Sequence, residues 1–123
     1  MKLFYIALFG ACGCVARYWV SLRVYALAGV GLPYGTLSVN ILGSFLLGLL
    51  MEIEWRSGFL SADLRTGLAV GFLGGFTTFS TFSYETLRLL EKGNLVQAGA
   101  NIVLNVVVCV VFAGLGIYCA RQF

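Results

Sequence analysis

The chain has 123 residues, of which 60% are hydrophobic and 11% charged, and its formal net charge at pH 7 is +3. Soluble domains carry about 25% charged residues, so this composition excludes an ordinary soluble protein. Charges are absent between Arg23 and Glu52, between Arg65 and Glu85, and between Lys92 and Arg121. Each interval can cross a bilayer, which takes about 20 mostly apolar residues. With a further apolar segment at the N-terminus, we expect an all-α membrane protein with four transmembrane helices in a single domain, residues 1–123.

The first hydrophobic segment, about residues 3–28, reaches spanning length only if Arg17 is carried into the membrane or to its edge. Such a guanidinium must snorkel to the interface, meet a partner or line a water-filled vestibule, and a role in an anion entrance is open. The segment also offers small residues that let another helix approach closely: Ala7, Gly10, Ala11 and Cys14. Its start could pass for a signal peptide or lipidation site, but the polytopic remainder favours a first transmembrane helix.

The second helix is predicted over about residues 32–51, with Pro33 suited to its first turn. Asn40, Ser44 and Gly48 recur every four residues and so form a narrow stripe of polar and small side chains. An intramembrane asparagine often links helices by hydrogen bonds, worth on the order of 1 kcal/mol. At mid-membrane depth Asn40 is also a neutral donor for an anion, and both interpretations stay open.

The third segment, about residues 64–90, contains G-F-L-G-G-F-T-T-F-S-T-F-S-Y-E from Gly71 to Glu85. Gly74 and Gly75 each weaken a helix by about 1 kcal/mol. The hydroxyl side chains that follow can bond freed backbone groups; they are Thr77, Thr78, Ser80, Thr81 and Ser83. We therefore predict a break in this helix, and non-helical backbone at this depth must be buried in protein or line a cavity.

A broken helix offers ligands for ions of either sign. Its carbonyl oxygens suit a hard cation such as sodium, whereas amide and hydroxyl groups suit an anion. Phenylalanines recur nearby at helical spacing, at Phe72, Phe76, Phe79 and Phe82, and simple packing explains that spacing. Because the edge of a phenyl ring is electropositive, ring edges could also replace lost water around a small anion.

The fourth helix is predicted over about residues 94–120. Its polar and small residues follow one slowly winding stripe: Gln97, Asn101, Asn105, Cys109 and Ala113. The other faces are almost entirely Val, Leu, Ile and Phe, so the stripe is expected to face protein or water.

The sequence lacks the residues of common catalytic and metal sites. It contains no His, and Cys12 and Cys14 are two apart on a helix and point to different sides. We interpret these cysteines, with Cys109 and Cys119, as small apolar packing residues. No nucleophile stands beside a base and no phosphate loop is present, so we expect neither an enzyme nor a nucleic-acid partner.

Positive charges are balanced between the two ends of the predicted bundle. Lys2, Arg56, Arg65 and Arg121 lie on the side of the termini, and Arg17, Arg23, Arg88 and Lys92 lie on the other. Because an excess of Lys and Arg in short loops orients membrane proteins, a tie permits insertion in both directions. This predicts an antiparallel homodimer, although one misplaced loop boundary would remove the tie.

The third segment, with P-Y-G-T-L-S-V-N-I-L-G-S from Pro33 to Ser44, resembles the bacterial fluoride channel family, the Fluc or CrcB proteins. The resemblance covers essentially the whole chain, including Arg17, Tyr18 and Trp19. It implies a multi-pass protein of the bacterial plasma (inner) membrane that lets fluoride leave the cell passively and so lowers fluoride toxicity. It also implies a dual-topology homodimer in membrane lipid, with two antiparallel pores and one structural sodium ion at the subunit interface.

By position, the resemblance assigns roles to residues of the two motifs. Phe79 and Phe82 would line the pore with their ring edges, Asn40 would lie at its vestibule, and Ser80 and Thr81 would supply hydroxyls. The backbone carbonyls of Gly74 and Thr77 would bind sodium, while Gly75 and Glu85 belong to the same motif. We place Asn105 and Cys109 in the pore as well, but with Asn101 they depart from the residues usual in relatives. Phe76 likewise stands where leucine is common.

Two other classes of membrane protein compete with this interpretation. A small multidrug exporter has a similar length and four helices, but it depends on an intramembrane glutamate in its first helix, which this chain lacks. A structural membrane subunit, in which the polar stripes only join helices, is the second alternative. A channel would have to replace hydration that costs on the order of tens of kcal/mol to remove in an apolar medium.

Overall fold

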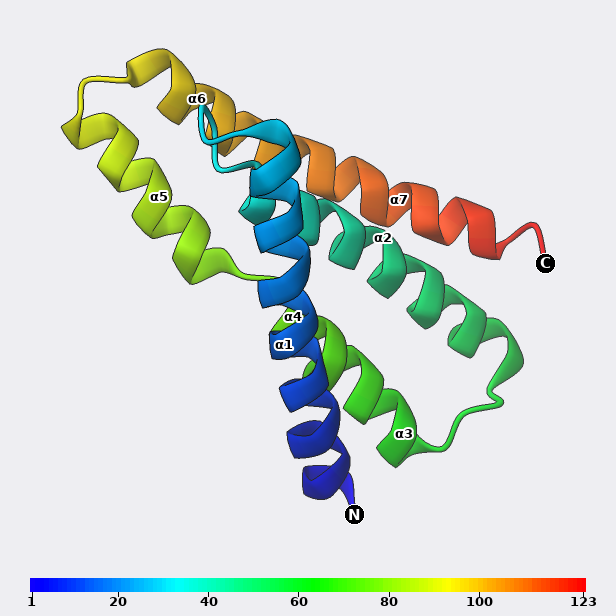
Figure 1. The fold of residues 1–123 in the computed structure, drawn as a ribbon. Coiled ribbons are helices and arrows are strands. Elements are labelled where there is room, and N and C mark those ends of the chain that lie inside the picture. The colour runs from blue at the N-terminus through cyan, green and yellow to red at the C-terminus, as the bar shows by residue number, and fades with distance from the viewer.

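The computed structural model describes all residues, 1–123, and its regular elements are all helices. They are α1 (Lys2–Ala28), α2 (Tyr34–Ser57), α3 (Ala62–Thr66), η1 (Gly67–Leu73), α4 (Gly74–Phe76), α5 (Phe79–Glu91), α6 (Leu95–Val103), η2 (Leu104–Val108) and α7 (Cys109–Ala120). The segments η1 and η2 are π-helical, and each continues directly into its neighbours (Figure 1). The predicted all-α class is confirmed.

Three helices are long and apolar enough to cross a membrane: Lys2–Ala28, Tyr34–Ser57 and Leu95–Ala120. The third hydrophobic segment contains no single helix of that length because it is interrupted between α4 and α5. The prediction of a broken third helix is therefore confirmed, while four membrane crossings stay a prediction.

The break lies at Thr77 and Thr78, whose backbones are extended, with ψ of 160° and 118°. The side chain of Thr78 caps α5 by accepting a hydrogen bond from the N–H of Thr81 at 3.3 Å. Gly74 and Gly75 are themselves helical. A Cβ on Gly75 would lie 2.9 Å from the carbonyl oxygen of Gly10, so this glycine serves the close approach of α1 rather than the break.

The second helix ends at Ser57, and the predicted end near Met51 is wrong. The charged residues after Met51 suggested a loop, but Glu54 is only 5% exposed and lies inside the helix. Its carboxylate accepts from the N–H of Leu60 at 3.1 Å and pairs with Arg65 at 3.4 Å. The connection is thereby shortened to residues 58–61, and the third segment begins at Ala62 instead of residue 64.

Glycines set the helix contacts. A Cβ on Gly13 would overlap the carbonyl oxygen of Phe72 in η1, and one on Gly48 of α2 would overlap that of Ala113 in α7. Of the small residues predicted to form an interface on α1, Gly10 and Cys14 lie at its contact with η1 and α4. Ala7 and Ala11 are exposed.

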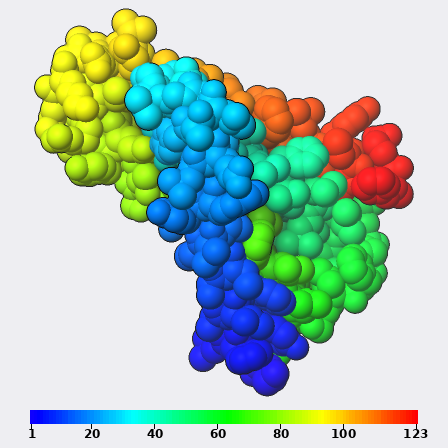
Figure 2. All heavy atoms as spheres, in the orientation of Figure 1, coloured from blue at the N-terminus to red at the C-terminus, as the bar shows by residue number.

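The isolated chain leaves most of its apolar surface uncovered. Only 20 of the 123 residues are buried, although the chain is 60% hydrophobic. In Figure 2 the α5–α6 lobe (yellow) and the α2–α3 region (green) diverge on either side of α1. Lipid or further protein must therefore cover these faces, since contiguous exposed apolar surface is rare on soluble monomers.

Candidate functional site

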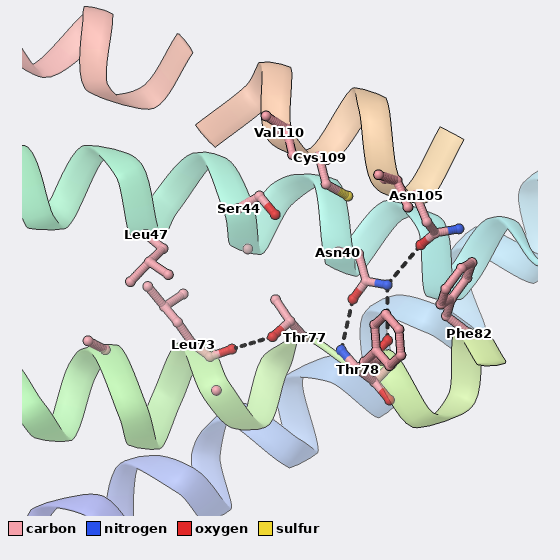
Figure 3. Close-up of a pocket in the computed structure, with 15 residues that line it drawn as sticks. Asn40, Ser44, Leu47, Leu73, Thr77, Thr78, Phe82, Asn105, Cys109 and Val110 are labelled. Atoms are coloured by element: carbon pink, nitrogen blue, oxygen red, sulfur yellow. Dashed lines mark hydrogen bonds between the residues drawn. The ribbon is translucent and has the colours of Figure 1, made fainter. Parts of the chain in front are cut away.

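A cavity of about 370 Å³ lies beside the helix break (Figure 3). It unites seven of the residues assigned from the sequence to the pore or the sodium site: Asn40, Gly74, Thr77, Phe79, Phe82, Asn105 and Cys109. Ser44, Leu47, Leu73, Thr78 and Val110 are among its other lining residues. No charged side chain lines it, so any ion inside would meet only dipoles, ring edges and apolar groups.

The carboxamide of Asn40 binds the backbone of Thr78 at the break. Its Oδ1 accepts from the N–H of Thr78 at 2.8 Å, and its Nδ2 donates to the carbonyl oxygen of the same residue at 3.0 Å. Because an N–H can only donate, this pair fixes which way the carboxamide faces. Asn40 thus satisfies both backbone groups of a residue that has left the helix, groups that are costly to leave unpaired.

Asn40 also begins a chain of side-chain hydrogen bonds into the fourth helix. Its Nδ2 donates to Oδ1 of Asn105 at 2.9 Å, and Nδ2 of Asn105 donates to Oδ1 of Asn101 at 3.0 Å. Nδ2 of Asn101 donates in turn to Oγ1 of Thr86 at 2.9 Å. Both hydrogens of the Asn40 amide are therefore engaged by protein, and an anion could use one only by displacing a protein acceptor.

Thr86 did not stand out in the sequence. It lies on α5, is 8% exposed, and donates its hydroxyl to the carbonyl oxygen of Phe82 at 2.8 Å. The spacing of Thr78, Phe82 and Thr86, each four residues after the last, could have indicated a shared helix face.

The two phenylalanines form an edge-to-face pair. The ring centroids of Phe79 and Phe82 are 5.2 Å apart with the planes at 63°. Phe82 is 7% exposed, whereas Phe79 is 74% exposed. One ring is thus seated inside the chain and the other stands at its surface.

Ser80 and Thr81 do not line the cavity beside the break. Ser80 is exposed, with its Oγ 3.5 Å from Oγ1 of Thr78. Thr81 accepts a hydrogen bond from the Thr78 hydroxyl at 3.0 Å and lines a second cavity, of about 310 Å³. Of the two predicted hydroxyls, Thr81 therefore lies at a different cavity from Phe79 and Phe82, and Ser80 lines neither cavity.

Arg17 and Glu85 share this second cavity with Thr81. Oε2 of Glu85 accepts from the hydroxyl of Tyr25 at 2.9 Å, while Oε1 is buried without a protein partner. Arg17 is half-buried and forms no ion pair within the chain. Its guanidinium is therefore not ion-paired with Glu85, although both residues line this cavity.

The break also redirects the donors that serve the carbonyls of Gly74 and Thr77. In a continuous α-helix these carbonyls would accept from the N–H groups four residues on, those of Thr78 and Thr81. Here the N–H of Thr78 donates to Asn40, and that of Thr81 donates to the hydroxyl of Thr78. No cluster of His, Cys, Asp and Glu could hold a metal, so backbone oxygens such as these are what the chain offers a hard cation.

Comparison with known proteins places this chain in a family. A family model described as "CrcB-like protein, Camphor Resistance (CrcB)" matches residues 4–117. A protein of Syntrophotalea carbinolica is 68% identical over 122 residues, 99% of each chain, and is named "Fluoride-specific ion channel FluC". Proteins of the same name from Geotalea uraniireducens and Geobacter sulfurreducens are 57% and 56% identical, over 95% of this chain and 94% of theirs. These relatives are named as channels, not enzymes, in agreement with the sequence prediction.

Proposed function

Because the chain belongs to the CrcB-like protein family, we propose that it is a fluoride-specific ion channel of the bacterial plasma (inner) membrane, through which fluoride leaves the cell passively. The observation that carries the proposal is the sequence identity of 68%, over 99% of each chain, with a relative that bears this name. The rival exporter and structural-subunit interpretations have no comparable support.

The chemistry of the cavity fits a reversible anion path. Fluoride must exchange its water for fixed donors, and conduction needs binding that is favourable yet weak enough to release the ion. The cavity supplies the electropositive edges of Phe79 and Phe82 and the thiol of Cys109, whereas the amide of Asn105 donates to two oxygens of Asn101. Without a Lys or Arg in its lining, the cavity has no full positive charge to trap the ion.

We place the working channel in an antiparallel homodimer with two pores, each chain crossing the membrane four times. The fourth crossing would combine the two halves of the broken segment, Ala62–Phe76 and Phe79–Glu91. The 74% exposure of Phe79 supports a partner, because a ring edge that guides an anion must be shielded from lipid. The balance of Lys and Arg between the two ends supports the dual orientation.

A structural sodium ion is proposed to lie between the subunits. The carbonyls of Gly74 and Thr77 have lost their usual helical donors, and the same pair from a second copy would double the oxygen ligands. When bound, the ion would supply a fixed positive charge and a link between the subunits. The chain's own contribution is to hold the two carbonyls in place, which the Asn40 contacts to Thr78 do.

Fluoride efflux from liposomes tests the proposal. Purified protein is reconstituted, and release is followed with a fluoride electrode, with chloride release as the control. We expect rapid fluoride release and no chloride release in sodium buffer, and slower fluoride release when N-methylglucamine replaces sodium on both sides. No fluoride release in sodium, or equal release of both halides, would refute the channel. Indifference to the cation would refute the sodium site alone.

A further inference from the structure

Five hydrogen bonds form a continuous path that begins and ends on the backbone at the start of α5. Between these ends the path passes through side chains of α2, η2 and α6. The bonds run from the N–H of Thr78 to Asn40, then to Asn105, Asn101, Thr86 and finally the carbonyl oxygen of Phe82. We call these six residues the closed chain. The backbone segment that it brackets, residues 78–82, carries both rings of the Phe79–Phe82 pair.

The direction of every bond in the closed chain is fixed by its two ends. The N–H of Thr78 can only donate and the carbonyl of Phe82 can only accept, so each carboxamide between them has one compatible orientation. Donors and acceptors then follow head to tail, an arrangement in which neighbouring hydrogen bonds strengthen one another. The segment that carries the rings is therefore held at both ends by α2, η2 and α6.

Burial makes the closed chain sensitive to the loss of any member. Asn101 is 1% exposed, Asn105 is 7% exposed and Thr86 is 8% exposed, so water cannot readily replace a lost partner. Asn101 and Thr86 are not among the residues that line the cavity beside the break, whereas Asn40, Asn105 and Phe82 are. The two residues therefore reach the cavity only through other members.

We infer that Asn101 and Thr86 are positioning residues, which set the place of the Phe79–Phe82 rings without touching the passing anion. Loss of the Thr86 hydroxyl removes its hydrogen bond to the carbonyl of Phe82, which keeps the N–H of Thr86 as its helical donor, and leaves the amide of Asn101 without its acceptor. The turn that carries the rings then loses one of its two anchors, while Asn40 still holds the other. This inference rests on the proposed channel function for its flux readout only.

The test compares Thr86→Val, which removes the hydroxyl at nearly constant shape, with Thr86→Ser, which retains it. Thr66→Val is the matched control, because Thr66 makes the same kind of hydroxyl bond, to the carbonyl of Ala62 at 2.9 Å, in the other half of the broken segment. We expect Thr86→Val to lower fluoride flux about tenfold or more, the size of effect that loss of an outer-shell partner has at metal sites. Thr86→Ser and Thr66→Val should keep the flux of the unaltered protein.

A second readout does not depend on conduction. A fluorine label on the ring of Phe79, introduced as 4-fluorophenylalanine, should give a ¹⁹F resonance that shifts or splits in Thr86→Val and returns in Thr86→Ser. Asn101→Leu breaks the same bond from α6 and keeps the test decisive if Thr86→Val does not fold. The inference would be overturned if the resonance or the flux were unchanged in Thr86→Val and Asn101→Leu. It would also be overturned if Thr86→Ser were as impaired as Thr86→Val. Failure of the unaltered protein to conduct would instead overturn the channel proposal.

Discussion

At the scale of single residues, the carboxamide of Asn40 supplies hydrogen bonds that the backbone loses where the helix breaks. It meets the N–H and the carbonyl of Thr78 at 2.8 and 3.0 Å, just where the third segment leaves helical geometry. The sequence offered two roles for Asn40, a link between helices or an anion donor. The observed contacts belong to the first role, and they explain why a break can persist beside a cavity.

Replacing Asn40 with leucine should therefore destabilise the fold as well as the pore. Asn40→Leu leaves two backbone groups of Thr78 without partners, and each unsatisfied buried group costs about 1–3 kcal/mol. The measurement is the unfolding midpoint of the purified protein in detergent. Gln97→Leu is the control, since this amide of the fourth helix is exposed. Equal midpoints for the two variants would contradict this role for Asn40.

At the scale of elements, hydrophobic length and spacing predicted the positions of the helices. The break was predicted from Gly74, Gly75 and the hydroxyls that follow, and it lies at the hydroxyls, because the two glycines are helical. The end of α2 could not be predicted because it depends on partners of Glu54 that follow in the sequence, Leu60 and Arg65. The π-helical segments could not be predicted either, since apolar periodicity does not encode the local change of hydrogen-bond pattern. Of the residues assigned to the pore, Phe79, Phe82 and Asn105 line one cavity, whereas Thr81 lines another.

Two glycines of α7 offer a matched test of helix packing. A Cβ on Gly116 would overlap the carbonyl oxygen of Phe45 in α2, whereas one on Gly114 meets nothing within 4 Å. We expect Gly116→Ala to lower stability by about 1–3 kcal/mol through overpacking. Gly114→Ala should be neutral or raise stability by up to about 1 kcal/mol, because alanine favours helix. Detergent unfolding midpoints that fall equally, or rise in both, would show that the α2–α7 contact is not this close.

At the scale of the whole molecule, the sequence assigns equal numbers of Lys and Arg residues to the two ends of the chain. The N-terminus, the C-terminus and the end of α2 lie toward one end, and the turn between α5 and α6 lies at the other (Figure 1). The connection between α1 and α2 borders the same far end, since Val30, Gly31 and Lys92 line one surface pocket. The sequence could indicate this balance, but not how one copy covers the exposed face of another, which depends on the shape of both.

Adding lysines to one end only should restrict the chain to a single orientation in the membrane and abolish the channel. Ser57→Lys with Gln122→Lys adds charge to the end that holds the termini, and Leu27→Lys with Gly31→Lys adds it to the other, all at exposed positions. Because short loops rich in Lys and Arg stay in the cytoplasm, each double variant should insert in one orientation, opposite to the other. Reporters fused to the C-terminus check the orientation, and fluoride efflux checks the function.

An antiparallel homodimer needs both orientations in one membrane. Each double variant alone should therefore release fluoride at a small fraction of the unaltered rate, and expression of the two together should restore release. The matched control adds one lysine to each end, Ser57→Lys with Gly31→Lys, which keeps the tie at two more charges and should stay active alone. Full efflux from either one-sided variant alone would mean that parallel copies or single chains conduct, and the antiparallel arrangement would then be wrong.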